Sequence, residues 1–151
     1  MKYLLDSNTV SDIYNPSAEN HHRFIKKILA LKENDDVFIS VLTLYEFEYA
    51  FANSPAHKKN EIRATISQIQ QDFIVLPLSP TAAEIFGDLK NLFKELRNIK
   101  SENLKKHTID LIIAADALNH RAVLVSADKI YQDIQFIKPE LNIENWMIIQ
   151  R

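Results

Sequence analysis

The sequence of 151 residues contains no cysteine and a single glycine, Gly87. Without cysteine, the chain cannot form disulfides, thiolate metal sites or a cysteine nucleophile. This composition fits a reducing compartment, and we expect the protein to be cytoplasmic. The sequence also lacks an apolar run long enough to cross a membrane, and the apolar stretch at its N-terminus is too short for a signal peptide. We therefore expect no membrane partner.

An excess of positive charge is also missing. Lys and Arg number 18 against 20 Asp and Glu, which gives a formal net charge of −2. A nucleic-acid partner would therefore need a local basic surface. Residues 90–106 offer one, with six basic residues against only Glu95 and Glu102. These six are Lys90, Lys94, Arg97, Lys100, Lys105 and Lys106, and the last five are our candidates for binding RNA phosphates. The stretch fits phosphate binding and the solvated face of a helix equally well.

Hydrophobic periodicity predicts alternating strands and helices along the chain. We predict strands at residues 2–5, 37–40, 73–76, 122–125 and 146–149. We predict helices at residues 9–14, 18–33, 43–53, 55–72, 79–96 and 109–118. We expect residues 98–107 to form a loop or a helical extension, and residues 133–145 to be irregular. The alternation indicates an α/β fold around a mostly parallel sheet with right-handed crossovers.

Three of the predicted helices carry further expectations. Ser7 or Asn8 is positioned to cap the first one. Residues 43–53 are apolar almost all round, so we expect that helix and its aromatic residues to be buried. The alternative is that these aromatic residues, Tyr45, Tyr49 and Phe51, anchor a partner protein. Gly87 within a helix costs about 1 kcal/mol relative to alanine, so we expect a close approach there.

Four acids stand at places where ligands bind in α/β folds. Asp6 and Asp128 follow predicted strands, Asp110 begins a helix, and Glu46 lies in the apolar helix. Each has an ordinary alternative, as a cap, a turn residue or the partner of a lysine. In that apolar helix Glu48 points away from Glu46, and the pattern alone leaves open which of the two needs a partner. Carboxyl ends of parallel strands share one edge, so the four acids can converge.

Converging carboxylates repel one another and raise each other's pKa unless a cation is present. Oxygen-only ligands suit Mg²⁺ or Mn²⁺ rather than a soft metal. Such a cation lowers the pKa of a bound water and contacts a phosphate oxygen. The four acids therefore point to metal-assisted hydrolysis of a phosphodiester.

Four segments of the chain resemble, in order, the motifs of PIN-domain ribonucleases, and most closely those of VapC toxins of bacterial toxin–antitoxin pairs. They are Leu4–Val10 (LLDSNTV), Ile39–Phe47 (ISVLTLYEF), Asp110–Leu118 (DLIIAADAL) and Leu124–Asp128 (LVSAD). The resemblance implies a single PIN-like domain over residues 1–151. It also implies three α/β/α layers around a mostly parallel sheet of four to five short strands.

The resemblance also assigns roles to residues. It implies that Asp6, Glu46, Asp110 and Asp128 bind Mg²⁺ or Mn²⁺ and catalyse RNA cleavage, which favours Glu46 over Glu48. Ser126 would replace the family's usual threonine and orient the site through a hydrogen bond, and Asn8 would support the ligands. By the same resemblance, the partners are RNA, a small VapB-like antitoxin that offers a basic side chain, and a further copy in a homodimer or larger assembly.

One acid departs from the family pattern, because Asp116 stands where we expect a small or hydroxyl residue. It lies about 120° around the helix from Asp110, so we expect a surface or supporting position rather than a metal ligand. Two other functions compete with the nuclease. One is a PIN-like module that binds RNA or protein without cutting, against which the presence of all four acids weighs. The other is a haloacid-dehalogenase-like phosphatase with Asp6 as nucleophile, which requires an acid where the chain has Asn8.

Overall fold

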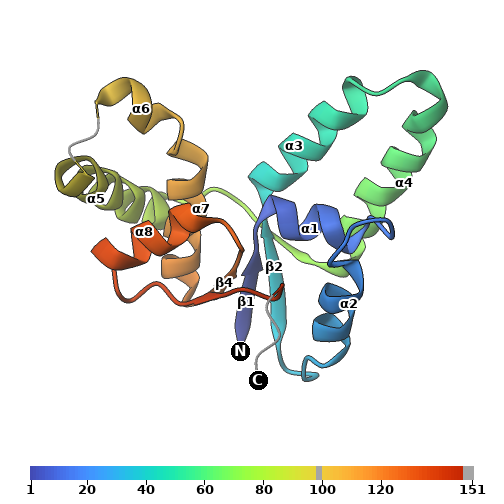
Figure 1. Cartoon of the computed structure of the whole chain (residues 1–151), viewed down its shortest axis with the longest axis horizontal. Helices are drawn as coiled ribbons and strands as arrows, with labels where there is room; N and C mark the ends of the chain where they lie inside the picture. The colour runs from blue at the N-terminus through green and yellow to red at the C-terminus, as the bar shows by residue number, and fades with distance from the viewer. Residues whose placement is uncertain (98–99, 148–151) are drawn as a thin grey trace.

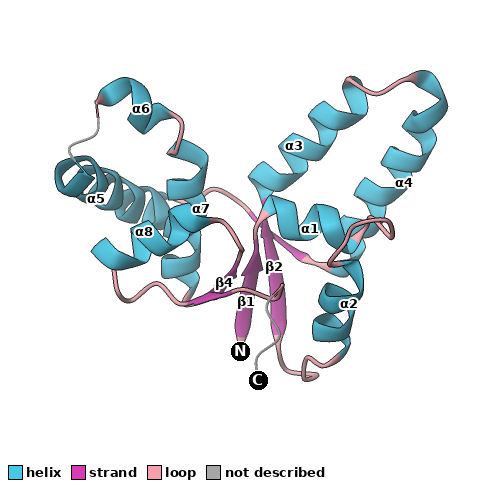
Figure 2. Ribbon diagram, in the orientation of Figure 1, coloured by secondary structure: helices cyan, strands magenta, loops and turns pink. Residues whose placement is uncertain are grey.

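The protein is described here by a computed structural model, which covers residues 1–97 and 100–147. The elements are β1 (Lys2–Leu5), α1 (Ser7–Ile13), α2 (His21–Leu29), β2 (Asp36–Ser40), α3 (Val41–Ala52), α4 (Ala56–Asp72), β3 (Ile74–Leu76), α5 (Pro80–Arg97), α6 (Ser101–Lys105), α7 (Thr108–His120), β4 (Val123–Val125), α8 (Lys129–Ile137) and β5 (Ile143–Glu144). The strands form one sheet in the order β3-β2-β1-β4-β5, and every pairing is parallel. The predicted α/β class and parallel sheet are confirmed (Figure 2).

Helices cover both faces of this sheet and give it two separate hydrophobic cores (Figure 1). Neighbouring residues of a strand point to opposite faces. On β1, Leu4 therefore packs with α5, α6, α7 and α8, while Tyr3 and Leu5 pack with α1, α2 and α4. The three-layer α/β/α arrangement predicted from the resemblance is confirmed. Tyr3, Leu4 and Leu5 of β1, the middle strand of the sheet, are all buried.

The second half of the chain differs from the prediction in two places. Residues 129–137, partly predicted as irregular, form α8, because Tyr131 and Ile134 are buried with Ile130 and Ile137 packed beside them. The last strand is β5 rather than residues 146–149, of which 148–149 lie outside the described residues. Within residues 98–107, predicted as a loop or a helical extension, residues 101–105 are helical, and residues 98–99 lie outside the described part.

Three further predictions are corrected by the structure. The helix predicted at residues 18–33 is shorter and spans only α2. The cap of α1 is Asp6 rather than Ser7 or Asn8, because its side chain accepts the N–H of Thr9. The close approach expected at Gly87 is absent, since a Cβ there would meet nothing within 4 Å in the described part of the chain.

The largest correction concerns α3, which is not buried. Thr43 is its one buried residue, while Tyr45 and Tyr49 are 69% and 71% exposed. The helix packs along one stripe against α4, and together they project from the sheet as an arm (Figure 1). Phe51 is only partly buried, and the cations of Lys59 and Arg63 lie 4.6 and 4.1 Å from its ring centre. Among the described residues, no helix combines the length and apolar character needed to cross a membrane.

Candidate active site

Three strands deliver functional side chains to the same edge of the sheet. Asp6 follows β1, α3 follows β2 directly, and Ser126 follows β4. The backbone N–H of Asp6 donates to the Val125 carbonyl at 3.1 Å, which ties the ends of β1 and β4 together. The carboxyl edge of the sheet is where open α/β folds bind ligands. The acids predicted to follow strands therefore lie at this edge.

Asp6 is the most buried of the four acids, with 5% of its surface exposed. Its Oδ2 accepts a hydrogen bond from Ser126 Oγ, and its Oδ1 accepts the Thr9 N–H at 2.9 Å. Ser126 Oγ in turn accepts the N–H of Asp128 at 3.0 Å. Burial raises the pKa of Asp6, the hydrogen bonds from Ser126 and Thr9 oppose this rise, and the charge of Asp128 adds to it. Asp6 is therefore held in one orientation by groups that favour its ionised form.

Glu46 and Asp110 reach the same place from opposite sides of the sheet edge. Burial raises the pKa of Glu46, a hydrogen bond with Ser7 lowers it, and the charges of Asp110 and Asp6 raise it further. The pKa of Asp110 is raised by burial and by the charge of Asp128. Each acid thus feels the negative charge of at least one other. This mutual effect is the electrostatic signature of carboxylates that share a site.

Two neighbours hold Asp110 that the sequence analysis did not place at the site. Tyr131 donates its hydroxyl to Asp110 Oδ1 at 3.4 Å, and His107 Nδ1 lies 3.6 Å from Asp110 Oδ2. Tyr131 was missed because α8 was not predicted. Its helical spacing to Ile134 was the available signal. His107 packs the edge of its ring on Phe93, with ring centres 5.7 Å apart, which fixes its position beside Asp110.

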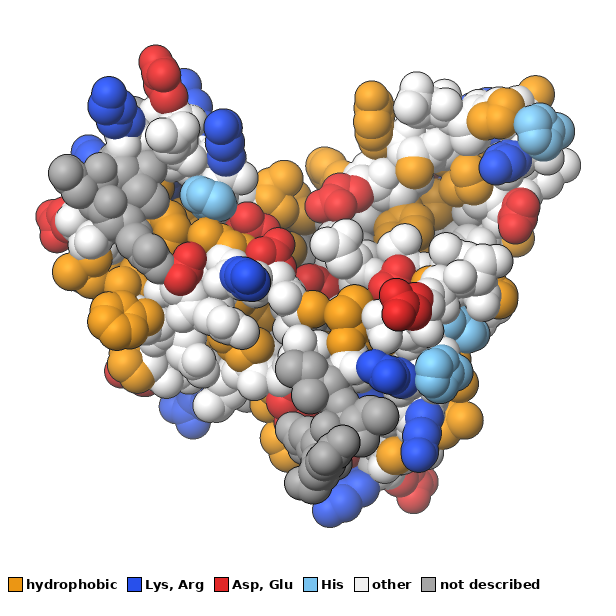
Figure 3. Space-filling model, viewed as in Figure 1, with side chains coloured by type: hydrophobic (Ala, Val, Ile, Leu, Met, Phe, Trp, Pro, Cys, Tyr) orange, Lys and Arg blue, Asp and Glu red, His pale blue; other side chains and the backbone are white. Residues whose placement is uncertain are grey.

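A cavity of about 130 Å³ joins all four predicted acids. Its walls are Asp6, Ser7, Asn8, Glu46, Ile109, Asp110, Ile113, Asp128 and Tyr131. In Figure 3, acidic side chains gather on the floor of a hollow between the α3–α4 arm and the helices on the other side of the sheet. Asp128 is exposed and caps α8, accepting the Ile130 N–H at 3.1 Å.

The acidic side chains that line this cavity offer carboxylate oxygens, which are the ligands that a hard divalent cation such as Mg²⁺ prefers. As they stand, no three Asp, Glu or His side chains within residues 1–97 and 100–147 are close enough to hold one ion together. Bringing them onto a common ion therefore requires side-chain rotation. Burial and the neighbouring carboxylates raise the pKa of Asp6, Glu46 and Asp110, and a bound cation would oppose this rise.

The other predicted residues are distributed around this cavity. Asn8 lines it and also a neighbouring cavity of about 210 Å³ behind Asp6 and Asp128. Lys100, Lys105 and Lys106 are exposed around α6, and Figure 3 shows basic side chains gathered there, on one rim of the hollow. Lys94 is exposed on α5, while the side chain of Arg97 lies outside the described residues.

Asp116 does not lie at the surface, so that part of the prediction is wrong. It is 1% exposed and shares no cavity with the four acids in the described structure. Burial raises the pKa of its carboxyl from 3.8 to about 6. The 120° offset from Asp110 correctly separates the two side chains, but it turns Asp116 towards α5 rather than towards water.

The PIN domain family model matches residues 3–137 of this sequence. The chain therefore belongs to the PIN-domain family, and the predicted resemblance is confirmed. PIN domains are generally metal-dependent nucleases, so family membership supports a nuclease. Among curated proteins, none matches the sequence.

Solved structures agree on the fold. A chain of VapBC2 from Rickettsia felis, bound to a DNA fragment from its promoter, is 23% identical with a TM-score of 0.76, covering 97% of this chain and 99% of that one. A chain of VapBC-1 from nontypeable Haemophilus influenzae is 20% identical with a TM-score of 0.76, covering 98% and 100%. A chain of DNA-bound VapBC from Salmonella typhimurium is 22% identical with a TM-score of 0.74, covering 97% and 98%. At these identities the likeness establishes the fold.

Proposed function

We propose that this protein is a Mg²⁺- or Mn²⁺-dependent endoribonuclease and the toxin of a VapBC-type toxin–antitoxin pair. The observation that carries the proposal is the cavity into which four separate segments of the chain each bring one carboxylate. The reaction is attack of water on an RNA phosphodiester. Asp6, Glu46 and Asp110 hold the cation, and Asp128, which is exposed and caps α8, completes the set.

The cation supplies a water of lowered pKa and a positive contact for the phosphate oxygens. The chain's own groups set up the arrangement. Ser126 and the Thr9 N–H keep the carboxylate of Asp6 in one orientation. Tyr131 and His107 do the same for Asp110. Because the pKa of each of these acids is raised, a cation that stabilises the ionised forms also binds more tightly as the pH rises.

The substrate reaches this cavity through the hollow seen in Figure 3. Lys105 and Lys106, on its basic rim, contact RNA phosphates on either side of the cleaved bond, together with Lys94, Arg97 and Lys100. Phosphate contacts of this kind give affinity without reading sequence. They explain how a chain with a net charge of −2 binds a polyanion through one local surface.

A VapB-like antitoxin restrains the nuclease. The similar structures named above are VapBC complexes, and this chain offers such a partner two complementary features. The acid cavity binds a basic side chain, best an arginine whose planar fork matches a carboxylate. Beside it, Tyr45 and Tyr49 expose apolar and aromatic surface of a kind common at protein interfaces. The chain itself assembles as a homodimer or larger oligomer.

The decisive experiment measures cleavage of single-stranded RNA by the purified chain with Mg²⁺, with Mn²⁺ and with excess EDTA. A matched pair on α3 separates the site from its surroundings. Glu46→Gln removes an acid of the cavity, whereas Glu48→Gln removes an acid that pairs with Arg63 at 2.7 Å outside it. We expect metal-dependent cleavage that Glu46→Gln abolishes and Glu48→Gln retains. A folded, metal-loaded wild type without cleavage would identify a binding module that does not cut.

The toxin role has a separate test. The chain is expressed alone and together with the protein encoded by the neighbouring reading frame. We expect growth arrest by the chain alone, relief by the neighbour, and loss of RNA cleavage in the purified complex. Arrest that the neighbour does not relieve would leave a nuclease without this restraint and contradict the pairing.

A further inference from the structure

A second acid on α7 is buried, and one of its two carboxylate oxygens has no hydrogen-bond partner in the described part of the chain. Asp116 is 1% exposed, its Oδ2 makes no hydrogen bond, and none of the ion pairs between described residues includes it. The only cause that raises the pKa of this carboxyl is burial, so none of the four acids of the active site acts on it. Buried charges in proteins are normally paired or bind cations. Asp116 therefore needs a partner from outside the described chain.

Asp116 lines a cavity of about 160 Å³ where α5 begins and crosses α7. The walls of this cavity are Leu78, Ser79, Ala82, Ala83, Phe86, Ile112 and Asp116. It shares no residue with the cavity of the four acids. Only two of its side chains are polar, and one of them, Ser79, already accepts the Ala82 N–H at 3.2 Å through its Oγ. The cavity is thus lined mainly by apolar side chains and contains one carboxylate without a counter-ion among the described residues.

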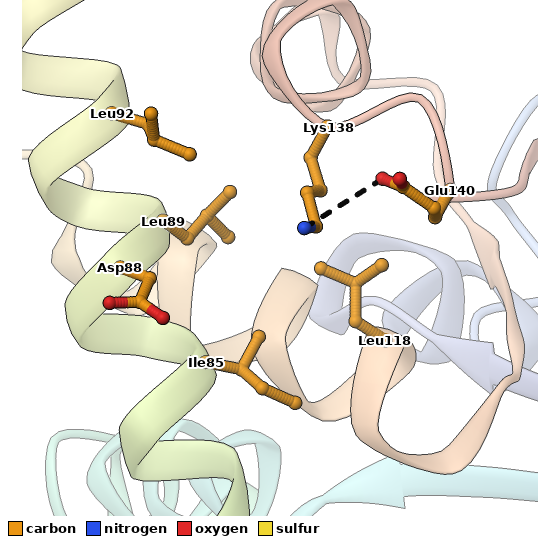
Figure 4. Close-up of a pocket in the computed structure, with 7 residues that line it drawn as sticks. All are labelled: Ile85, Asp88, Leu89, Leu92, Leu118, Lys138 and Glu140. Carbon is orange, nitrogen blue, oxygen red and sulfur yellow. Dashed lines mark ion pairs between the residues drawn. The ribbon is translucent and has the colours of Figure 1, made fainter.

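The larger cavity on the other side of α5 shows what a compensated site looks like. Its volume is about 280 Å³, and its walls include the leucines Leu89, Leu92 and Leu118. Figure 4 shows Lys138 pointing into this cavity beside Glu140, and these two charges pair at 3.9 Å. Its other acid, Asp88, is exposed to solvent. Both acids of that cavity are compensated, Glu140 by Lys138 and Asp88 by its exposure to solvent, whereas Oδ2 of Asp116 is buried and has no hydrogen-bond partner among the described residues.

The chemistry of the Asp116 cavity selects among possible partners. A divalent cation would need about six oxygen ligands, and the cavity offers one carboxylate and one hydroxyl. A guanidinium group prefers to contact both oxygens of a carboxylate, whereas only Oδ2 of Asp116 lacks a hydrogen-bond partner. A primary ammonium needs few acceptors, and its alkyl stem matches the apolar walls. Phe86 adds a ring face that already attracts the Lys90 ammonium at 5.5 Å.

We propose that this cavity binds a primary ammonium group at the end of a short alkyl chain, with Asp116 as its counter-ion and Ser79 as a second acceptor. The volume agrees with this ligand, since a cavity of about 150 Å³ holds a molecule the size of benzene, and n-butylammonium is of similar size. Leu78, 58% exposed, stands at the entrance, where the rest of the ligand would emerge. The site does not depend on the proposed nuclease activity.

The test follows the carboxyl carbon of Asp116 by NMR in the full chain while n-butylammonium is added at pH 7. We expect saturable binding and a downward shift of the pKa of Asp116. Two controls isolate the charge. n-Butanol has the same stem without the ammonium, and Asp116→Asn has the same shape without the carboxylate. Each should weaken binding at least about tenfold, because a hydrogen bond between charged groups is lost.

Further measurements address the folding of the variant, a possible pair between Asp116 and Lys90, and the source of the amine. Ala83→Leu, at an exposed helix position, narrows the cavity and should also weaken binding if Asp116→Asn fails to fold. Putrescine and Nα-acetyl-lysine amide distinguish a free diamine from a lysine of a partner protein, and the tighter ligand identifies the source. Equal binding to wild type and Asp116→Asn would overturn the proposal. A rise in the pKa of Asp116 in a Lys90→Gln variant would also overturn the proposal, because Lys90 would then be the partner of Asp116.

Discussion

Helices α3 and α7 have nearly the same composition pattern and opposite surroundings. Both are apolar almost all round, yet α7 buries six residues and α3 buries one. The difference comes from their place in the fold. α7 packs between α5, α8 and β4, whereas α3 contacts α4 along one side and otherwise projects from the sheet (Figure 1). Apolar sequence therefore shows that a surface needs cover, and the fold decides whether the same chain supplies it.

The two helices meet at the candidate site, and each contributes an acid from its own environment. Asp110 starts the buried helix α7 and is held by Tyr131 and His107. Glu46 lies on the exposed arm, where Ser7 is its one hydrogen-bond partner among the described residues. The cavity therefore combines a fixed carboxylate with one whose position depends on the arm. Variants in each helix test whether these two environments differ as described.

The largest effect is expected from Asp110→Asn in α7. Loss of a group that merely supports a metal ligand typically costs about 10–100-fold, so loss of the ligand itself should lower RNA cleavage by more than about 100-fold. Initial rates at saturating Mn²⁺ provide the measurement. Asp88→Asn, an exposed acid of α5 outside this cavity, is the control and should keep wild-type rates. Full activity of Asp110→Asn would remove α7 from the site.

The next effect concerns the buried side of α7. Leu111 is 0% exposed, so Leu111→Ala should lower the free energy of unfolding by about 2–5 kcal/mol. Urea unfolding followed by circular dichroism measures this value. A loss well below 1 kcal/mol would show that α7 is not packed as described.

The sequence predicted the positions of the acids better than their surroundings. Short β-branched and leucine-rich runs followed by Asp6 and Asp128 define strand ends, and parallel strands put those ends together. Helix α8 was not predicted, because Ile130, Tyr131 and Ile134 were not recognised as one apolar face of a helix. Tyr131 was therefore not predicted as a residue of the site, although its helix begins directly after Asp128.

Burial was the property that the sequence could not supply. Helical periodicity placed Asp116 about 120° from Asp110, which is correct, but it could not show that α5 covers that side. The same limit explains the failure for α3, where Tyr45 and Tyr49 were assigned to the core. A one-dimensional pattern states which residues share a face, and only the packing states what lies against that face.

Asp116→Asn should change how stability depends on pH. The unfolded carboxyl releases its proton near pH 3.8, and the folded one near about 6. Between these values the folded state binds more protons, so the free energy of unfolding falls as the pH rises, and it stays lower above pH 6. At about 1.4 kcal/mol per pKa unit, Asp116 accounts for at most about 3 kcal/mol of this fall.

Urea unfolding of wild type and Asp116→Asn at several pH values from 4 to 8 isolates this contribution. Other acids with raised pKa values, such as Asp6 and Glu46, change stability in the same direction, but they are common to both proteins. The difference between the two curves should therefore change with pH only through Asp116. Parallel curves would mean that Asp116 has a partner in solution.

The smallest effect is expected on the exposed face of α3. Tyr49→Ser should change the free energy of unfolding by less than about 0.5 kcal/mol, because the side chain is 71% exposed and, among the described residues, no other aromatic ring packs on its ring. Phe51→Ser in the same helix is the control, and it should cost more, since Lys59 and Arg63 pack on that ring. Unfolding is measured at low and high protein concentration. If Tyr49→Ser costs as much as Leu111→Ala, and only at high concentration, a second copy of the chain covers α3 in solution. The contrast between the two helices would then hold for the single chain and disappear in the assembly.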